Sequence, residues 1–162
     1  MGNAIEVACA KQAEKAPSVK VELGGNVRHP QYGRYLEEFV AGEVFEHPRG
    51  FTISEAYMLD FATSFMESNP LYLNEGFAKA HGFERRPASP LLLLNLALSQ
   101  GVQNDSEKAI AHLGYYDVLF LRPAYAGDTI RSLTKVLGRK ERGEGKPGIA
   151  ELRTVGVNQR NE

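Results

Sequence analysis

Residues 91–98 form a nearly unbroken run of apolar side chains, and this run constrains the fold more than any other feature. Leucine fills six of its eight positions, and only Asn95 interrupts it. A buried strand fits the length, but leucine without β-branched neighbours favours a helix. Pro90 suits the first turn of that helix and Gly101 its end. A helix without a polar face must be surrounded, so the sequence predicts a central helix enclosed by the domain.

Composition excludes several classes of protein. The chain has 162 residues, the size of one ordinary domain, and the run at 91–98 is far shorter than the roughly 20 residues of a membrane helix. Nineteen basic residues and twenty acidic ones give a net charge of -1, which argues against non-specific electrostatic binding to nucleic acid. A single cysteine, Cys9, excludes a disulfide framework, and no two histidines have metal-ligand spacing. No secretory signal is visible, so we expect a cytoplasmic protein without a metal site or a membrane anchor.

The chain divides into an arm and one folded domain. Residues 1–30 are rich in alanine, lysine and glutamate and low in apolar density. Such a segment buries too little surface to offset the entropy of ordering it. We therefore expect a poorly ordered arm over 1–30 and the folded domain over 31–162.

The first half of that domain combines one strand with helices. β-Favouring residues over 43–53 surround Pro48, which predicts an edge strand or a bulge. Ser54 is a helix N-cap, and Asn69-Pro70 is expected to end that helix. A second short helix over 75–80 closes at Gly82.

The second half is predicted to be antiparallel sheet. Alternation around 116–120 indicates a strand closed by Arg122-Pro123, and further strands follow over 129–137 and 149–157. A turn at 158–161 comes last, with nothing after it. The domain therefore reads as lacking its last strand. Either the chain is truncated, or another chain covers the edge of the 149–157 strand.

Several short motifs carry a resemblance to a known family. They are Ile53-Ser54-Glu55-Ala56, Asn69-Pro70-Leu71-Tyr72, Ala109-Ile110-Ala111-His112-Leu113-Gly114-Tyr115 and Arg122-Pro123-Ala124-Tyr125-Ala126-Gly127-Asp128-Thr129. Together they resemble the MaoC-like dehydratases, most closely the N-terminal half of the mesaconyl-CoA hydratase family. The resemblance implies an α+β hotdog fold, in which an antiparallel sheet wraps a central apolar helix. It also implies a second hotdog domain, either as a homodimer partner or on the same polypeptide.

The resemblance further implies a hydro-lyase chemistry. The family adds water to an enoyl-CoA or removes it from a 3-hydroxyacyl-CoA, with no cofactor beyond the CoA of the substrate. Its catalytic acid position falls on Glu67 and its histidine position on Tyr72, while the position of its oxyanion-binding N–H falls on Pro90, which has none. Substrate contacts are expected from four further residues: Asn69, Arg85, Arg86 and Ser89.

Three functional interpretations follow. In the first, this domain is a scaffold half with a degenerate active site, inactive alone, and a partner hotdog supplies the acid and base. In the second, it is an active enoyl-CoA hydratase that uses Glu67 with Tyr72 as a hydrogen-bond donor. In the third, it is a non-enzymatic acyl-CoA binding module. Among the histidines, His47 precedes a proline and is interpreted as a turn or strand-edge residue, and His112 as a hydrogen-bonded structural residue.

Overall fold

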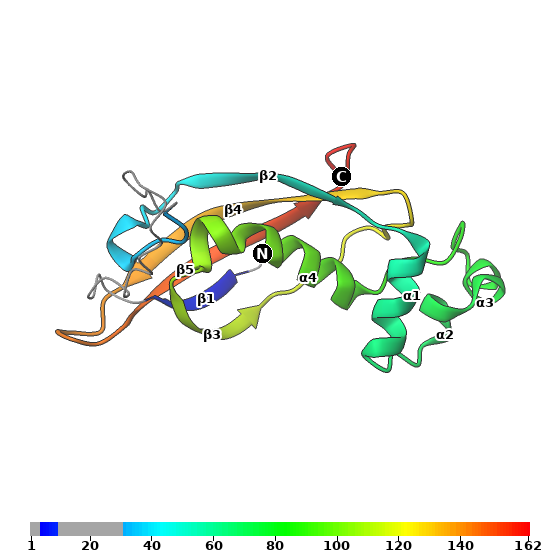
Figure 1. The fold of residues 1–162 in the computed structure, drawn as a ribbon, viewed down its shortest axis with the longest axis horizontal. Helices are drawn as coiled ribbons and strands as arrows, with labels where there is room; N and C mark the ends of the chain where they lie inside the picture. The colour runs from blue at the N-terminus through cyan, green and yellow to red at the C-terminus, as the bar shows by residue number, and fades with distance from the viewer. Residues whose placement is uncertain (1–3, 10–30) are drawn as a thin grey trace, which may run out of the picture.

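The computed structural model describes residues 4–9, as backbone, and residues 31–162. These form one antiparallel five-stranded sheet in the order β2-β4-β5-β1-β3. The strands are β1 (Ala4–Cys9), β2 (Val44–Thr52), β3 (Ala109–Tyr116), β4 (Thr129–Lys140) and β5 (Gly148–Val157). A long helix, α4 (Pro90–Gly101), lies along one face of this sheet (Figure 1).

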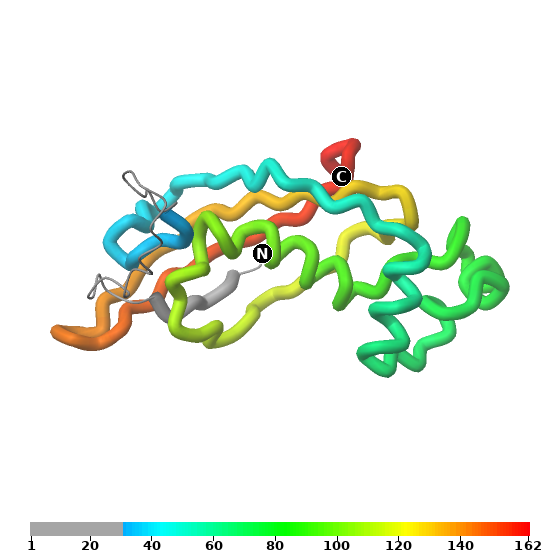
Figure 2. Tube along the Cα trace, viewed as in Figure 1, coloured from blue at the N-terminus to red at the C-terminus, as the bar shows by residue number. Residues whose placement is uncertain are grey.

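The remaining helices are short. A 3-10 turn, η1 (Leu36–Glu38), precedes β2, and a π-helical turn, η2 (Val102–Ser106), continues α4. The helices α1 (Glu55–Ser64), α2 (Pro70–Leu73) and α3 (Glu75–Ala80) gather at one end of the molecule. The β4–β5 loop, orange in Figure 2, forms the opposite end. Among the described helices, none is long and apolar enough to cross a bilayer.

Strand β2 contains the bulge predicted from its proline. The register of β2 against β4 shifts between His47 and Phe51, on either side of Pro48. Proline cannot donate a hydrogen bond to the ladder, so the strand bulges there and resumes pairing beyond it. The strand runs at the edge of the sheet and leads directly into α1.

Helix α1 begins as predicted and ends earlier. Ser54 caps it, its Oγ accepting a hydrogen bond from the N–H of Tyr57 at 3.1 Å. The helix ends at Ser64 rather than at Asn69-Pro70, because Met66 adopts a left-handed conformation with φ of 53° and turns the chain. Asn69 instead starts α2, its side-chain oxygen accepting from the N–H of Leu71 at 3.0 Å. The Asn-Pro pair is therefore a helix start, which corrects the prediction.

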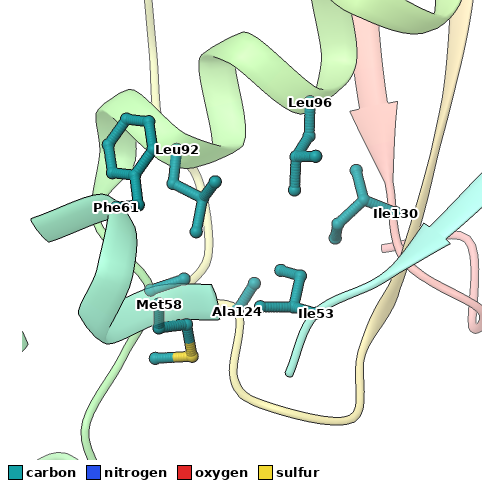
Figure 3. Packing of buried hydrophobic residues seen from close by; sticks show 8 residues of the cluster. Ile53, Met58, Phe61, Leu92, Leu96, Ala124 and Ile130 are labelled. Atoms are coloured by element: carbon teal, nitrogen blue, oxygen red, sulfur yellow. The ribbon is translucent and has the colours of Figure 1, made fainter. Parts of the chain in front are cut away.

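The core lies between α4 and the sheet. Leu92 and Leu96 on α4 pack with Ile53 at the end of β2, Met58 on α1 and Ile130 on β4 (Figure 3). The opposite side of α4 is open, since Leu91 is 53% exposed while Leu92 is fully buried. The prediction of an apolar helix is confirmed, but its enclosure on every side is wrong for this chain.

The strand predicted around 116–120 lies earlier than expected. β3 ends at Tyr116, and Asp117 adopts a left-handed φ of 52° that breaks the extended run. The alternating residues beyond it belong to a loop. Large apolar side chains of β3 and this loop are exposed, and we call them the apolar band: Ile110, Leu113, Tyr115, Tyr116, Val118, Leu119, Phe120 and Leu121.

The N-terminal segment departs most from expectation. Ala4–Cys9, predicted to lie in an arm outside the core, forms β1 between β5 and β3. Five of the six residues of β1 are apolar, with Glu6 the exception, so the low apolar density of residues 1–30 as a whole conceals a short segment suited to a strand. The predicted open edge along 149–157 is paired with β1 over 149–152, whereas 153–157 have no strand neighbour on that side among the described residues. Residues 1–3 and 10–30 of the predicted arm lie outside the described residues.

Candidate functional site

The expected acid, Glu67, lies in the loop between α1 and α2. The N–H of Glu67 bonds to the carbonyl of Ala62 at 2.8 Å, and one carboxylate oxygen accepts from the N–H of Asn69 at 3.2 Å. Asn69 in turn uses its side chain to cap α2. The loop thus holds Glu67 by local hydrogen bonds, and Asn69 shapes the loop with a side chain already engaged.

Tyr72 lies within electrostatic reach of Glu67. Partial burial, together with the negative charge of Glu67, raises the pKa of Tyr72 above its usual value near 10. Both causes favour the neutral phenol. At neutral pH Tyr72 can donate a hydrogen bond but cannot remove a proton from water, which is the task of a general base.

Arg86 anchors the segment that leads into α4. Its guanidinium is 6% exposed and pairs with Glu55 at 3.1 Å, and its N–H donates to the Glu75 carboxylate at 2.8 Å. Those backbone and side-chain bonds tie the starts of α1 and α3 to the segment before α4. Arg86 therefore presents little of its charge to solvent.

Arg85 takes the opposite orientation. It is exposed, and its guanidinium carbon lies 5.2 Å from the centre of the Tyr125 ring. A cation at that distance is attracted by the ring face while its N–H groups stay in contact with solvent. Of the two arginines, Arg85 is the one whose charge is available to an anion.

Ser89 and Pro90 form the start of α4. Ser89 is buried, caps no N–H group with its side chain, and its hydroxyl has no hydrogen-bond partner among the described residues. Pro90 has no N–H, but helical geometry leaves the N–H groups of Leu91 and Leu92 without acceptors inside the helix. The start of α4 therefore combines main-chain donors, a positive dipole end and a nearby hydroxyl.

The structure brings some of the predicted residues together. Glu67, Asn69 and Tyr72 share the α1–α2 region, and Arg85, Arg86 and Ser89 share the segment before α4. The two described hollows lie elsewhere. One, of about 250 Å³, is bounded by α4, η2, β3 and β5, and another, of about 600 Å³, lies between β2 and the end of α4.

A buried polar cluster that the sequence did not reveal lies at the far end of α4. His47 on β2 is 2% exposed, with its Nε2 2.9 Å from the Thr134 hydroxyl and 3.6 Å from the Asp105 carboxylate. Burial lowers the pKa of His47 and raises that of Asp105. His47 lies on an edge strand as predicted, but its side chain points inward, and no local sequence signal links it to Asp105.

His112 is the other histidine for which a role was predicted. His112 lies on β3 as expected, but its ring is exposed and stacks on Tyr115 with centres 6.2 Å apart. Within residues 31–162 and the short strand at 4–9, no group of three or more histidine, cysteine or acidic side chains could hold a metal ion.

Comparisons with known proteins give consistent results. The family model for mesaconyl-CoA hydratase matches residues 25–162. A mesaconyl-CoA hydratase of Cereibacter sphaeroides is 32% identical over 130 residues, which cover 80% of this chain and 38% of the relative. This chain therefore spans well under half the length of that protein.

Solved structures agree. A putative MaoC domain dehydratase from Chloroflexus aurantiacus superimposes with a TM-score of 0.79 at 31% identity, covering 84% of this chain and 39% of that one. A conserved hypothetical protein of Mycobacterium tuberculosis, described as having a double hotdog fold, gives a TM-score of 0.67 at 27% identity over 80% of this chain and 41% of its own. The expected α+β hotdog fold is confirmed.

Proposed function

The chain belongs to the mesaconyl-CoA hydratase family, and from this premise we propose that it is one hotdog half of a hydro-lyase acting on enoyl-CoA or 3-hydroxyacyl-CoA thioesters. In this proposal the domain supplies scaffold and CoA-side contacts, and a second hotdog domain supplies the acid and base. The chain alone does not catalyse the reaction.

The observation that carries the proposal is the state of Tyr72. Hydration needs a group that takes a proton from water as the water attacks the conjugated double bond. A phenol with its usual pKa near 10 is neutral at pH 7, and burial and the charge of Glu67 raise the pKa of Tyr72 further. Glu67 retains a carboxylate, but the acid in the Asp-x-Asn-Pro-x-His pattern of the MaoC-like family, which the chain resembles, is an aspartate, one methylene shorter. Catalytic groups must be held within about 0.5 Å of productive geometry, so that extra length disfavours proton transfer.

The start of α4 supports a role in holding the thioester. Negative charge develops on the thioester oxygen during attack, and main-chain N–H groups stabilise it best. Pro90 removes one such donor, and the N–H groups of Leu91 and Leu92 remain as candidates. The unpartnered hydroxyl of Ser89 lies beside them and is the substrate contact that the proposal retains from this segment.

The phosphate end of CoA is assigned to Arg85. A phosphate needs an exposed cation with free N–H donors, and Arg85 meets this requirement, whereas the Arg86 side chain is buried and pairs with Glu55. Arg86 is instead a positioning residue that holds the segment carrying Arg85 and Ser89. Asn69 has its oxygen engaged in capping α2, which leaves only its NH₂ group for substrate.

The second hotdog is expected to cover apolar surface of this one. The outer side of α4 at Leu91 and the apolar band on β3 and its following loop remain exposed here. Contiguous apolar surface of this kind is typical of protein–protein interfaces. The double hotdog described for the mycobacterial relative is consistent with such a pairing.

Hydration assays with crotonyl-CoA and mesaconyl-CoA test the proposal. The purified chain should give negligible turnover, and Glu67→Gln should change nothing. CoA binding measured by calorimetry should weaken several-fold in Arg85→Ala and remain unchanged in the exposed-arginine control Arg49→Ala. Turnover by the isolated chain that Glu67→Gln abolishes would contradict the proposal and establish an active hydratase that uses Glu67 and Tyr72. CoA binding without turnover, even beside a partner hotdog, would support a binding module instead.

A further inference from the structure

The buried polar cluster belongs to a layer of polar side chains that crosses the core. On the inward face of β4, Ser132 and Thr134 lie between Ile130 and Val136, which belong to two separate apolar clusters. His47 joins this layer from β2, and the hydroxyl of Ser132 has no hydrogen-bond partner among the described residues. Buried polar groups cost stability that apolar side chains would not, which indicates a role for the layer beyond packing.

The polar layer ends at a hollow. The hydroxyl of Thr134 lies 3.3 Å from that of Thr154, and His47 Nε2 lies 3.6 Å from the Asp105 carboxylate. Thr154 and Asp105 both line the hollow of about 250 Å³ that α4, η2, β3 and β5 bound. An apolar cavity of about 150 Å³ holds a benzene molecule, so this hollow has room for a ligand somewhat larger than benzene.

The charge of the hollow favours a cation. Its described lining includes the buried carboxylate of Asp105 and contains neither lysine nor arginine. Burial lowers the pKa of His47, so the imidazole beside this carboxylate is neutral at neutral pH, and burial raises the pKa of Asp105. An opposite charge stabilises a buried carboxylate, and a bound cation would supply that charge.

Two further polar groups of the hollow are left mainly as hydrogen-bond acceptors. The side-chain NH₂ of Asn95 donates to the carbonyl of Leu91 at 2.9 Å, and the Ser99 hydroxyl donates to the carbonyl of Leu96 at 3.1 Å. Those bonds leave the side-chain oxygen of Asn95 and the lone pairs of the Ser99 hydroxyl for other partners. Together with the Asp105 carboxylate, they favour a ligand that donates hydrogen bonds.

We propose that this hollow binds a small organic cation, a primary ammonium group on a short apolar or aromatic body. The ammonium group lies against the Asp105 carboxylate and donates its other N–H bonds to Asn95 and Ser99. The body of the ligand packs among the remaining apolar and aromatic lining residues: Leu98, Val102, His112, Tyr115 and Leu152. Such a ligand is opposite in charge to a CoA thioester, so this site is distinct from the one assigned to the thioester above.

Amide NMR titrations with three probes of similar shape test the charge of the ligand. Benzylamine is a cation at neutral pH, benzyl alcohol is neutral, and benzoate is an anion. Benzylamine should shift the amide signals of η2 and β3. Benzyl alcohol should bind about ten-fold more weakly, because hydrogen bonds between charged groups are stronger than those between neutral ones. Benzoate should not bind.

Two variants test the position of the site. Asp105→Asn keeps the shape of the side chain but removes its charge, so it should weaken benzylamine binding about ten-fold and leave benzyl alcohol binding unchanged. The matched control Asp60→Asn removes an exposed carboxylate on α1 and should change neither affinity. Asn95→Leu leaves the buried His47–Asp105 pair intact: Asn95 is exposed on α4, and a leucine there should fill the hollow and abolish binding of both probes.

Three results would overturn the proposal. One is absence of benzylamine binding to the wild-type chain, and another is equal affinity for benzylamine and benzyl alcohol. The third is wild-type affinity for benzylamine in Asn95→Leu or in a folded Asp105→Asn variant, which would put the binding site elsewhere. None of these measurements depends on hydratase activity, so the outcome is independent of the proposed function.

Discussion

Gly101→Ala is predicted to destabilise the protein although it places a better helix former in a helix. Gly101 has φ of -79° and ψ of -22°, which any residue adopts, so the backbone does not require glycine. A Cβ at this position would lie 2.8 Å from Asp105 Oδ2 and 3.1 Å from His47 Nε2. Both groups belong to the buried polar cluster and cannot move into solvent. Glycine is needed at position 101 because any larger side chain would overlap with Asp105 and His47.

The magnitude follows from two opposing effects. Alanine for glycine inside a helix stabilises by about 1 kcal/mol. Forcing a methyl group into a packed interior costs about 1–3 kcal/mol, and leaving a buried polar group without its hydrogen-bond partner costs about 1–3 kcal/mol. A displacement of Asp105 and His47 that combines part of both costs is near 3 kcal/mol, so the net loss is about 2 kcal/mol. For a domain of this size, Tm should fall by about 4–8 °C.

Urea unfolding followed by circular dichroism measures this loss. Gly76→Ala is the matched control: Gly76 also lies in a helix, α3, and its added Cβ would meet only the Asn74 side-chain oxygen, at 3.3 Å. The control should be unchanged or stabilised by up to about 1 kcal/mol. A Gly101→Ala variant as stable as its control would refute the close packing of His47 and Asp105 against α4.

Three further predictions concern charged and titrating groups. Glu55→Gln should destabilise the fold more than Arg86→Met, because the first removes the carboxylate paired with a buried guanidinium while the second releases a carboxylate that is already 69% exposed. The reverse order in urea unfolding would contradict this. Glu67→Gln should lower the pKa of Tyr72 towards its usual value, since one of the two causes of its rise is removed, and a ring-carbon NMR titration that shows no change would place Glu67 out of reach. Because the pKa of His47 is lowered in the native protein, the unfolded chain binds a proton more readily, and the free energy of unfolding should fall as the pH drops through about 6.5. The raised pKa of Asp105 acts in the opposite direction, at the lower pH values where aspartate side chains usually titrate. His47→Gln should lose the fall in unfolding free energy between about pH 7.5 and about pH 5.5, and an unchanged slope would assign the effect to another group.

Local chemistry made much of the fold predictable. The Ser54 cap, the glycine at Gly82 with φ of 87° and the turn at Gly127 with φ of 93° each follow from the preferences of one residue and its neighbours. The nearly unbroken apolar run at 91–98 likewise located α4. These features need no knowledge of distant contacts, which is why the sequence sufficed.

Non-local contacts could not be predicted in the same way. β1 enters the sheet through backbone pairing with β5 and β3. The β5 residues that pair with β1 lie more than a hundred positions further along the chain. The His47–Asp105 pair likewise joins an edge strand to a turn after α4. In the candidate site, the proximity of Glu67 and Tyr72 was predictable because both lie in one short stretch. The burial of Arg86 was not, because it depends on Glu55 and Glu75 in two other helices.

The apolar band has a consequence for any molecule of this protein that meets no partner. Leu121 is 87% exposed, and with its neighbours it forms an exposed apolar surface. Chaperones and degradative proteases recognise unfolded or unassembled proteins by surface of this kind. Covering that surface would therefore govern the lifetime of the polypeptide in the cell as well as its chemistry. The amount of this protein in the cell would then depend on the amount of the partner that covers the apolar band, because copies without that partner would be degraded.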